Sequence, residues 1–231
     1  MRKFWHWVKN EAGRTLYFDG YIAQDSWFDD DITPKKFKAE LTAATGDIAV
    51  WLNSPGGDVF AASQIYTMLK EYEGKVTVKI DGIAASAASV IAMAGDEIVM
   101  SPVAMLMIHN PATIVFGEAA DLASGIKLLS EVKESIINAY EQRTGLPRSK
   151  ISSMMDAETW FSAQKAVELG FADKILYAPE ASRDVTEGFM FDRVSVTNAL
   201  LRKLPRDKEK PPTVLAGTPH KELLTRLELL K

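Results

Sequence analysis

Short apolar runs with a two-residue period alternate with segments of helical period through residues 48–177, and this alternation restricts the fold more than any other feature. Ile48, Val50 and Leu52 form one such run, and residues 76–80 repeat it after a helical segment. Strands that are separated by helices usually pair side by side in parallel. The sequence therefore predicts an α/β fold with a mostly parallel sheet.

The longest helical pattern extends from Glu118 to about Arg143. Its apolar positions recur at steps of three and four residues, and they are Leu122, Ile126, Leu129, Val132, Ile136 and Tyr140. We expect one long helix here, with enough apolar positions both for the core and for contact with a partner.

Shorter patterns complete the predicted alternation. They are a helix from near Ser86 to Gly95, strands around 98–100 and 105–108, a helix at 162–169 and a strand at 171–177. Between these elements lie two carboxylates, Asp156 and Glu158, in a segment that we expect to be a loop.

The two ends of the chain differ from this central region. Residues 1–20 alternate loosely around a turn and predict an N-terminal hairpin. We assign residues 1–180 to the main domain and residues 181–204 to a peripheral segment. Four prolines among charges make residues 205–219 a linker. Leucines on one helical face make residues 220–231 an amphipathic tail helix.

Composition excludes several classes of function. The chain has no cysteine, which excludes disulfides, thiolate zinc sites and a cysteine nucleophile. Its formal net charge is −4 and its basic residues are scattered, which argues against a nucleic-acid partner. No apolar run approaches the length of a membrane span, and the basic N-terminus is not followed by the apolar stretch of a signal peptide. We expect a cytoplasmic protein with no membrane contact.

Ser86 is the first candidate for chemistry, because it directly follows a predicted strand and opens a helix among small residues. A hydroxyl at that place lies near free backbone N–H groups, which favour a developing negative charge. The alternative is an ordinary serine N-cap, a common feature of helix starts.

The glycine-rich segment 53–57 is the second candidate. Gly56 and Gly57 leave the backbone bare between a strand end and a helix start, so N–H groups can point at a ligand oxygen. The alternatives are an ordinary strand-to-helix turn and a phosphate loop, but the lysine and spacing of a Walker A motif are absent.

His109 is one of three histidines, and the other two lie near the termini. It ends an apolar run where a predicted strand leaves the sheet. A serine nucleophile needs a nearby base to remove its proton, and His109 is the histidine best placed to serve. The alternative is a histidine with a purely structural role.

Four segments in one order resemble the ClpP family of Clp protease proteolytic subunits. Residues 53–57 are similar to its glycine loop, 82–86 to its nucleophile segment, 107–111 to its histidine segment and 162–173 to its closing helix and strand. The resemblance covers residues from about 16 to 177. It implies an α/β fold of the ClpP/crotonase type, with repeated β-β-α units, a mostly parallel sheet and a long protruding helix.

The resemblance implies a serine endopeptidase with Ser86 as nucleophile and His109 as general base. It implies an oxyanion hole made by the backbone N–H groups of Gly57 and Ala87, and substrate contact at Gly56. The resemblance implies neither a cofactor nor a metal ion.

The third member of the catalytic triad is where this sequence departs from the family, which has an aspartate there. Matching the flanking residues without gaps puts Glu158 in that place, with Asp156 two residues earlier. Glutamate can orient an imidazole, although its extra methylene requires a backbone shift. We favour Glu158, with Asp156 as the alternative. A further alternative is that both residues are solvated charges on a loop with no catalytic role.

Two features separate this chain from the housekeeping members of the family. The aromatic segment 4–7 does not resemble the axial loops that meet an unfoldase ATPase, and the proline-rich linker and tail extend beyond the usual end. Both resemble the phage head-maturation branch, in which such a protease trims scaffold and capsid proteins inside an assembling prohead. The tail helix is then an assembly helix or, alternatively, a helix docked on its own domain.

The resemblance also implies self-association. Members of the family form rings, commonly stacked face to face, so we expect a homo-oligomer that uses the helix Glu118–Arg143. Whether a Clp-type ATPase feeds substrates to this chain stays open.

Two rival functions follow from the same fold family. One is a catalytically inactive ring subunit, which the glutamate at position 158 supports. The other is a crotonase-like acyl-CoA enzyme, but such enzymes typically rely on carboxylates, and the pair Ser86 and His109 argues against it.

Overall fold

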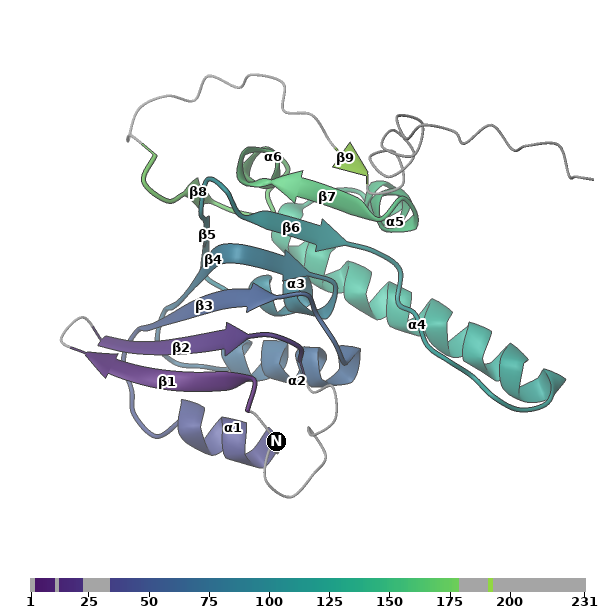
Figure 1. Cartoon of the computed structure of the whole chain (residues 1–231), viewed down its shortest axis with the longest axis horizontal. Helices are drawn as coiled ribbons and strands as arrows, with labels where there is room; N and C mark the ends of the chain where they lie inside the picture. Colours follow the sequence, from purple (N-terminus) through teal and green to yellow (C-terminus); the bar gives the residue numbers. More distant parts are fainter. Residues whose placement is uncertain (1–2, 11–12, 23–33, 179–190, 193–231) are drawn as a thin grey trace, which may run out of the picture. The chain divides into compact units, whose positions relative to one another are not determined.

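A computed structural model describes residues 3–10, 13–22, 34–178 and 191–192 (Figure 1). The strands are β1 (Trp5–Asn10), β2 (Gly13–Asp19), β3 (Ile48–Ser54), β4 (Val76–Ala85), β5 (Glu97–Met100), β6 (Met105–Ile108), β7 (Thr159–Ser162), β8 (Lys174–Ile175) and β9 (Phe191–Asp192). The helices are α1 (Pro34–Leu41), α2 (Val59–Lys70), α3 (Ala87–Ala92), α4 (Ala119–Thr144), α5 (Arg148–Asp156) and α6 (Ala163–Glu168).

The strands form one sheet in the order β1-β2-β3-β4-β6-β7-β9, and β5 and β8 extend it from β4. The central pairs, from β2 to β6 and on to β8, are parallel, whereas β1–β2, β6–β7 and β7–β9 are antiparallel. The prediction of an α/β fold with a mostly parallel sheet is therefore confirmed.

Strand β4 positions the site because its two halves have different neighbours. Its first half pairs with β5, where Ile80 lies opposite Met100. Its second half pairs with β6, where Ala85 lies opposite Met107. The ends of β4 and β6 therefore lie side by side, and the residues that follow both strands emerge at one edge of the sheet.

The core lies between the sheet and helices α1, α2 and α3, which all cover one face (Figure 1). Alternate residues of β3 and β4 point into it, and Val50, Leu52, Val78 and Ile80 are fully buried there. Ile65 of α2 is also fully buried against them. Burying an aliphatic side chain contributes about 1.5–3 kcal/mol, so this alternation stabilises the strands from which the site projects.

Helix α4 confirms the predicted long helix. It begins at a capping box formed by Glu118 and Asp121, and it ends at Gly145 in the left-handed conformation with φ 67°. Its second half is buried on one side, whereas Leu122 and Ile126 in its first half are 48% and 67% exposed. Figure 1 shows that this first half extends beyond the helices that cover the sheet.

The region around the two candidate carboxylates differs from the expected loop. Residues up to Asp156 form helix α5, and a strand, β7, begins directly after Glu158. The apolar positions of α5 span only two turns, which is too short for a clear helical pattern. Strand β7 exists through its pairing with β6, which no local pattern reports. The strand expected at 171–177 is reduced to the two residues of β8.

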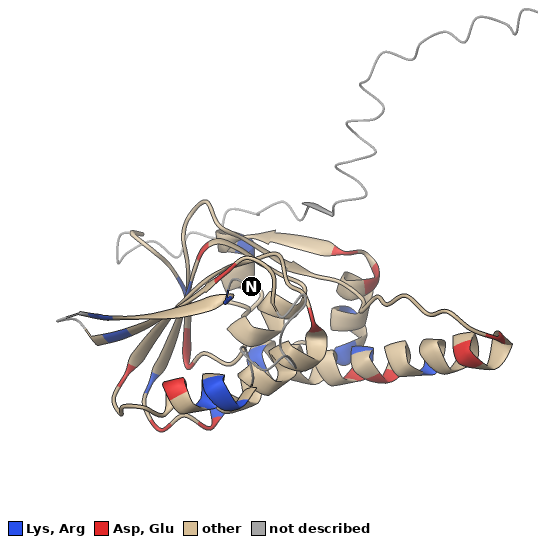
Figure 2. Cartoon of the chain, turned by 60° about the horizontal axis from the view of Figure 1, so that its bottom comes forward, with Lys and Arg blue, Asp and Glu red and all other residues tan. Residues whose placement is uncertain are grey.

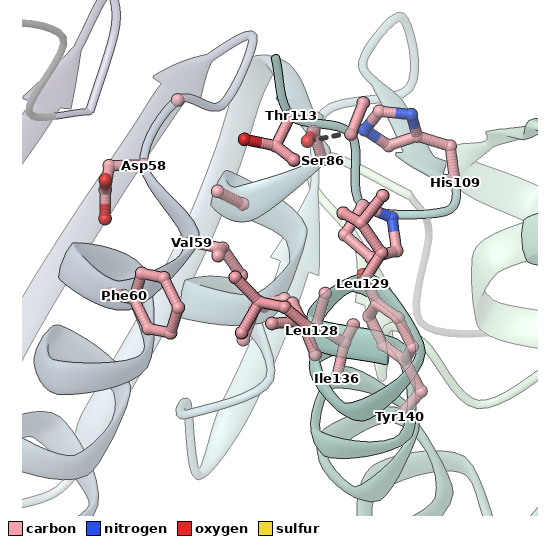
Figure 3. Close-up of a pocket in the computed structure, with 16 residues that line it drawn as sticks. Asp58, Val59, Phe60, Ser86, His109, Thr113, Leu128, Leu129, Ile136 and Tyr140 are labelled. Atoms are coloured by element: carbon pink, nitrogen blue, oxygen red, sulfur yellow. Dashed lines mark hydrogen bonds between the residues drawn. The ribbon is translucent and has the colours of Figure 1, made fainter. Parts of the chain in front are cut away.

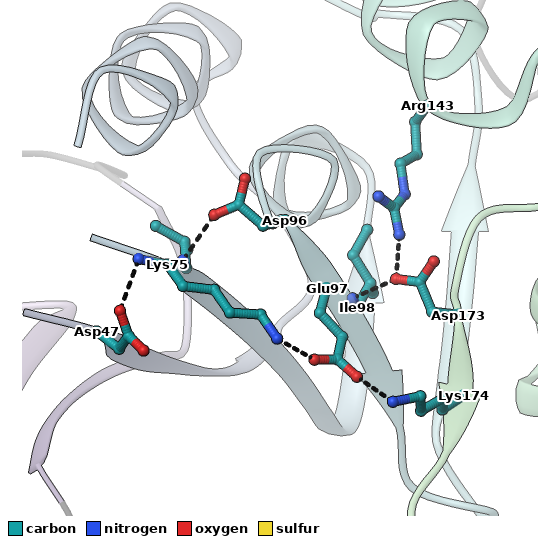
Figure 4. A network of polar contacts seen from close by, with 9 residues as sticks. Asp47, Lys75, Asp96, Glu97, Ile98, Arg143, Asp173 and Lys174 are labelled. Carbon is teal, nitrogen blue, oxygen red and sulfur yellow. Dashed lines mark hydrogen bonds and ion pairs between the residues drawn. The ribbon is translucent and has the colours of Figure 1, made fainter. Parts of the chain in front are cut away.

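Hydrogen bonds and ion pairs between charged side chains connect β5 and β8 to the rest of the fold (Figure 4). Glu97 on β5 accepts hydrogen bonds from Lys174 at 2.6 Å and from Lys75 at 2.7 Å. These two lysines lower the pKa of Glu97 to about 2. Asp173 accepts hydrogen bonds from Arg143 on α4 and from a backbone N–H of β5. Through Asp173 and Lys174, the segment of β8 is bound to both α4 and β5.

Acidic and basic positions are interspersed over the described elements, including α4 (Figure 2). No helix in the described part of the chain is both long and apolar enough to cross a membrane. The predicted linker 205–219 and tail helix 220–231 lie outside the described residues, as does the peripheral segment 181–204 apart from β9.

Candidate active site

Ser86 lies between the end of β4 and the start of α3, in a backbone conformation that is rare for a residue with a side chain. Its φ is 55° and its ψ is −127°. Its N–H donates to the carbonyl of Met107 on β6 at 3.0 Å, and its carbonyl accepts from the N–H of Ser89 at 2.9 Å. Such strained residues persist only where the surrounding structure holds them, and they cluster at functional sites.

The side chain of Ser86 contacts the candidate base. Its Oγ lies 2.6 Å from Nε2 of His109 (Figure 3). Ser86 occupies the N-cap position of α3, but its side chain makes no capping hydrogen bond. The N-cap alternative therefore does not explain this serine, because its hydroxyl points to the imidazole instead of the helix.

His109 follows β6 and is partly buried. Burial lowers its pKa from the ordinary value of 6.5, and the negative charge of Glu158 acts in the opposite direction. A lowered pKa keeps the imidazole neutral at neutral pH, which is the form that can accept a proton from a serine hydroxyl.

Glu158 is placed near His109 by the register of two strands. Strands β6 and β7 are antiparallel, and their ladder ends with Ile108 opposite Thr159, so His109 and Glu158 both leave the sheet at this end. Glu158 has φ 48°, and one of its carboxylate oxygens accepts a hydrogen bond from Trp160 at 3.4 Å. The negative charge of Glu158 raises the pKa of the His109 imidazole, against the effect of burial.

Asp156 has other partners. Its Oδ1 accepts hydrogen bonds from Lys133 of α4 at 2.6 Å and from the side-chain amide of Asn110 at 2.9 Å. The hydrogen bond from Lys133 is the main cause that lowers the pKa of Asp156. Asp156 therefore holds the residue next to His109 rather than the imidazole itself.

Gly57 has a backbone that only glycine can adopt here. It pairs with Ile22 in a parallel bridge, in which Ile22 N–H donates to Gly56 at 2.8 Å and Asp58 N–H donates to Ile22 at 3.0 Å. In such a bridge the N–H of the central residue points away from its partner strand. A Cβ on Gly57, whose φ is 145°, would lie 2.2 Å from the Ile22 carbonyl oxygen.

Gly56 is required for a different reason, because it packs directly on the nucleophile segment. A Cβ at this position would lie 2.7 Å from the Cβ of Ser86 and 2.8 Å from the carbonyl oxygen of Ala85. Ala87 follows Ser86 as the first residue of α3, where a backbone N–H has no acceptor within the helix. The structure thus brings both glycines and Ala87 to Ser86.

A cleft of about 360 Å³ opens in front of these groups (Figure 3). Ser86, Ala87, His109 and Gly57 line it together. Its walls also include side chains that the sequence analysis did not assign to the site, and they are Val59, Phe60, Val90, Thr113, Leu128, Leu129, Val132, Ile136 and Tyr140. A mostly apolar cleft with a few convergent polar groups is typical of a substrate-binding site.

Several of the unassigned cleft residues come from α4, which is far away in the sequence. Their helical periodicity had indicated only that they face the core or a partner. Tyr140 carried one further signal, because its hydroxyl must find a partner when the face is buried.

A serine hydroxyl that is hydrogen-bonded to a neutral imidazole, beside free backbone N–H groups, can carry out nucleophilic acyl transfer. The comparison with known proteins agrees with this chemistry. Residues 22–179 match the family model described as Clp protease.

Relatives support the same family. The chain is 34% identical over 169 residues to the ATP-dependent Clp protease proteolytic subunit 1 of Chlamydia muridarum. The aligned region covers 71% of this chain and 87% of the relative. It is 32% identical over 158 residues to the ATP-dependent Clp protease proteolytic subunit 1 of Protochlamydia amoebophila, with 67% of this chain and 77% of the relative aligned. It is 34% identical over 154 residues to the Clp protease proteolytic subunit of Porphyromonas gingivalis, covering 64% and 69%.

These matches confirm the ClpP resemblance and the enzyme class, a ClpP-like serine peptidase. The matched region contains every residue of the site described above. The chain belongs to the Clp protease family.

Proposed function

We propose that this chain hydrolyses peptide bonds as an endopeptidase through an acyl-enzyme, with Ser86 as nucleophile and His109 as general base. The observation that carries the proposal is the 2.6 Å contact between Ser86 Oγ and His109 Nε2. This contact lies in a mostly apolar cleft of about 360 Å³, a volume within the range of ligand-binding pockets.

The steps follow from the positions of these groups. Ser86 Oγ attacks the peptide carbonyl carbon while His109 Nε2 takes the hydroxyl proton. The negative charge that develops on the carbonyl oxygen is stabilised by the N–H groups of Gly57 and Ala87, each worth roughly 3 kcal/mol of barrier. When the C–N bond breaks, the protonated His109 gives its proton to the leaving amine. Water then attacks the acyl-enzyme with His109 again as base, and Ser86 is regenerated.

Glu158 is our proposed orienting acid. Two observations support this role: Glu158 and His109 directly flank the last pair of the β6–β7 ladder, and the charge of Glu158 raises the pKa of His109, which favours the imidazolium that forms during each transfer. Asp156 is already engaged by Lys133 and Asn110. We therefore assign Asp156 to holding the segment that follows His109.

We further propose that the chain works as a homo-oligomer, as a ring or stacked rings, through α4. The support is a set of apolar side chains that are exposed on the first half of α4 and on the segment before it, and they are Ile114, Phe116, Leu122, Ile126 and Leu128. Several large apolar side chains exposed within one short segment are typical of an interaction site. Size measurement by light scattering, with Ile126→Asp as the variant, tests this proposal.

Phage scaffold or capsid proteins are our proposed substrates, cut in the host cytoplasm or in an assembling prohead. The support is the N-terminal segment, which is built into the sheet rather than left as a free loop. Trp5 is 1% exposed, packs edge-on against Phe37 at 5.3 Å and donates a hydrogen bond to Glu40 at 2.8 Å. Co-expression with phage coat and scaffold proteins, followed by mass spectrometry of the fragments, tests this substrate class.

Labelling with a fluorophosphonate probe tests the activity itself. Wild type, Ser86→Ala and His109→Ala are treated with the probe, and the labelled peptide is located by mass spectrometry. We expect label on Ser86 in wild type and none in either variant, because only an activated serine reacts. An intact, oligomeric wild type that takes no label would point to the inactive ring subunit.

A further inference from the structure

The carbonyl of Ser86 is held by a second donor that the proposed mechanism does not use. Besides the N–H of Ser89, it accepts a hydrogen bond from the Ser89 hydroxyl, with an Oγ to O distance of 2.6 Å. The same Oγ lies 2.8 Å from the hydroxyl oxygen of Tyr140 on α4. Ser89 is completely buried and Tyr140 is 1% exposed, so water does not compete for these groups.

The chemistry of the three groups determines which of them donates in each of these two hydrogen bonds. The Ser86 carbonyl can only accept, so the Ser89 hydroxyl must donate to it. The Ser89 hydroxyl proton is then used, so the Tyr140 hydroxyl must donate to Ser89 Oγ. Burial raises the pKa of Tyr140, which keeps this phenol protonated as a donor. The Ser86 carbonyl, the Ser89 hydroxyl and the Tyr140 hydroxyl each have a hydrogen-bond partner in this arrangement.

We propose that Ser89 and Tyr140 are positioning residues that hold Ser86 in its strained conformation, and so set the direction in which its hydroxyl meets His109. The inference rests on the peptidase activity proposed above. The Ser89 hydroxyl is bonded to the Ser86 carbonyl and the Tyr140 hydroxyl to Ser89, so both side chains act through this carbonyl and not on Ser86 Oγ itself.

The strain at Ser86 is what gives this pair its effect. A φ of 55° is unfavourable for a residue with a side chain, and the peptide relaxes towards ordinary angles unless it is held on both sides. The N–H of Ser86 is fixed by β6, and its carbonyl is held on the other side by the N–H and the hydroxyl of Ser89. Relaxation of φ is a rotation about the N–Cα bond, which moves the carbonyl and the side chain together and would carry Oγ away from Nε2 of His109.

The surroundings show that packing alone does not require a tyrosine. The ring of Tyr140 packs edge-on against Phe171 at 5.8 Å, within an apolar cluster that would accept phenylalanine. In the described part of the chain, Ser89 is the hydrogen-bonding partner of the Tyr140 hydroxyl. A buried hydroxyl costs free energy unless it is bonded, so its presence points to the contact with Ser89.

The test compares Tyr140→Phe, Ser89→Ala and the double variant with wild type, using the fluorophosphonate probe on the full chain. Matched controls are Tyr66→Phe, which removes a hydroxyl bonded to Gln142 of the same helix α4, and Ser63→Ala, which removes a helical serine hydroxyl bonded to a backbone carbonyl. The measured quantities are the labelling rate at saturating probe, the half-saturating probe concentration and the final labelled fraction.

We expect the saturating rate to fall about tenfold in each single variant, since small misplacements of a reacting group cost up to about 10²-fold. The double variant should be no slower than the slower single variant, because both substitutions interrupt the same series of hydrogen bonds from Tyr140 through Ser89 to Ser86. The final labelled fraction, the half-saturating concentration and the pH midpoint should stay at their wild-type values. A merely structural role would lower the labelled fraction instead. Both controls should label at the wild-type rate.

Three outcomes would overturn the inference. They are variants that label as fast as wild type, a labelled fraction that falls in step with the rate, and a double variant whose loss is the product of the single losses. Each of them leaves the activity itself in place, provided that wild type is labelled on Ser86. A wild type without label would overturn the proposed activity, and the inference with it.

Discussion

Ser86 Oγ and His109 Nε2 are 2.6 Å apart although 23 positions separate the two residues in the chain. The contact follows from the parallel pairing of β4 and β6, in which Ala85 lies opposite Met107. Each strand ends within two residues of its functional side chain, so the sheet delivers nucleophile and base to the same edge.

The pH dependence of labelling should reflect the lowered pKa of His109. The base must be neutral, so the rate should rise with pH and reach its plateau above the pKa, with a midpoint below 6.5. In Glu158→Gln the midpoint should move to still lower pH, because the charge that raises the pKa of His109 is removed. Labelling rates between pH 4 and pH 8, roughly the range that brackets a histidine titration, check this. A wild-type midpoint at or above 6.5 would contradict it.

The two carboxylates should differ in their effect on rate. Glu158→Gln should slow labelling by at least about 10²-fold, because the imidazolium loses its stabilising charge. Asp156→Asn serves as the matched comparison and should stay within about threefold of wild type, since its contacts with Lys133 and with Asn110 are exposed. A larger loss in Asp156→Asn than in Glu158→Gln would reverse our assignment.

Gly57→Ala should remove activity for a steric reason. Its Cβ would lie 2.2 Å from the Ile22 carbonyl oxygen, so the bridge that we propose to orient the Gly57 N–H for the oxyanion cannot form. Gly20→Ala is the control, because Gly20 also has a positive φ but no atom within 4 Å of an added Cβ. Gly20→Ala should cost about 1–2 kcal/mol of unfolding free energy and keep the wild-type labelling rate.

These two glycine variants are compared by urea unfolding and by labelling. Gly57→Ala should unfold at lower urea than Gly20→Ala and should take up little label. Equal labelling in both variants would argue against an oxyanion role for Gly57.

Stability should depend on Glu97 in a defined pH window. Its pKa is lowered from 4.5 to about 2 in the folded chain by hydrogen bonds from Lys174 and Lys75. A lowered carboxyl pKa stabilises the folded state above the unfolded value and loses this effect as pH falls through the folded value. The melting temperature of wild type should therefore exceed that of Glu97→Gln at pH 6 and approach it near pH 2.

The difference between these two proteins should be no more than about 2 °C, because exposed ion pairs contribute little. Lys38→Gln is a suitable control, since its ion pair with Glu71 is long, at 3.8 Å, and exposed. It should leave the melting temperature unchanged at both pH values. A gap between wild type and Glu97→Gln that widens on acidification would contradict the assignment.

Local patterns predicted the parts of this molecule that depend on short stretches of chain. The alternation of apolar residues indicated the central strands, and the helical spacing between Glu118 and Arg143 indicated α4. Serine after a strand, paired glycines before a helix and histidine at a strand end marked the residues that the structure brings together. Each of these signals depends on the conformational preferences of a few consecutive residues.

The remaining features depend on contacts between distant segments. The pairing of β7 with β6 brings the ends of both strands, next to His109 and Glu158, together, and the packing of α4 brings Tyr140 to Ser89. The sequence by itself determined the type of fold, the family and the candidate nucleophile and base. Only the tertiary structure decided how the carboxylates divide their partners and what holds Ser86, because strand register and helix packing are set by long-range contacts that local periodicity does not encode.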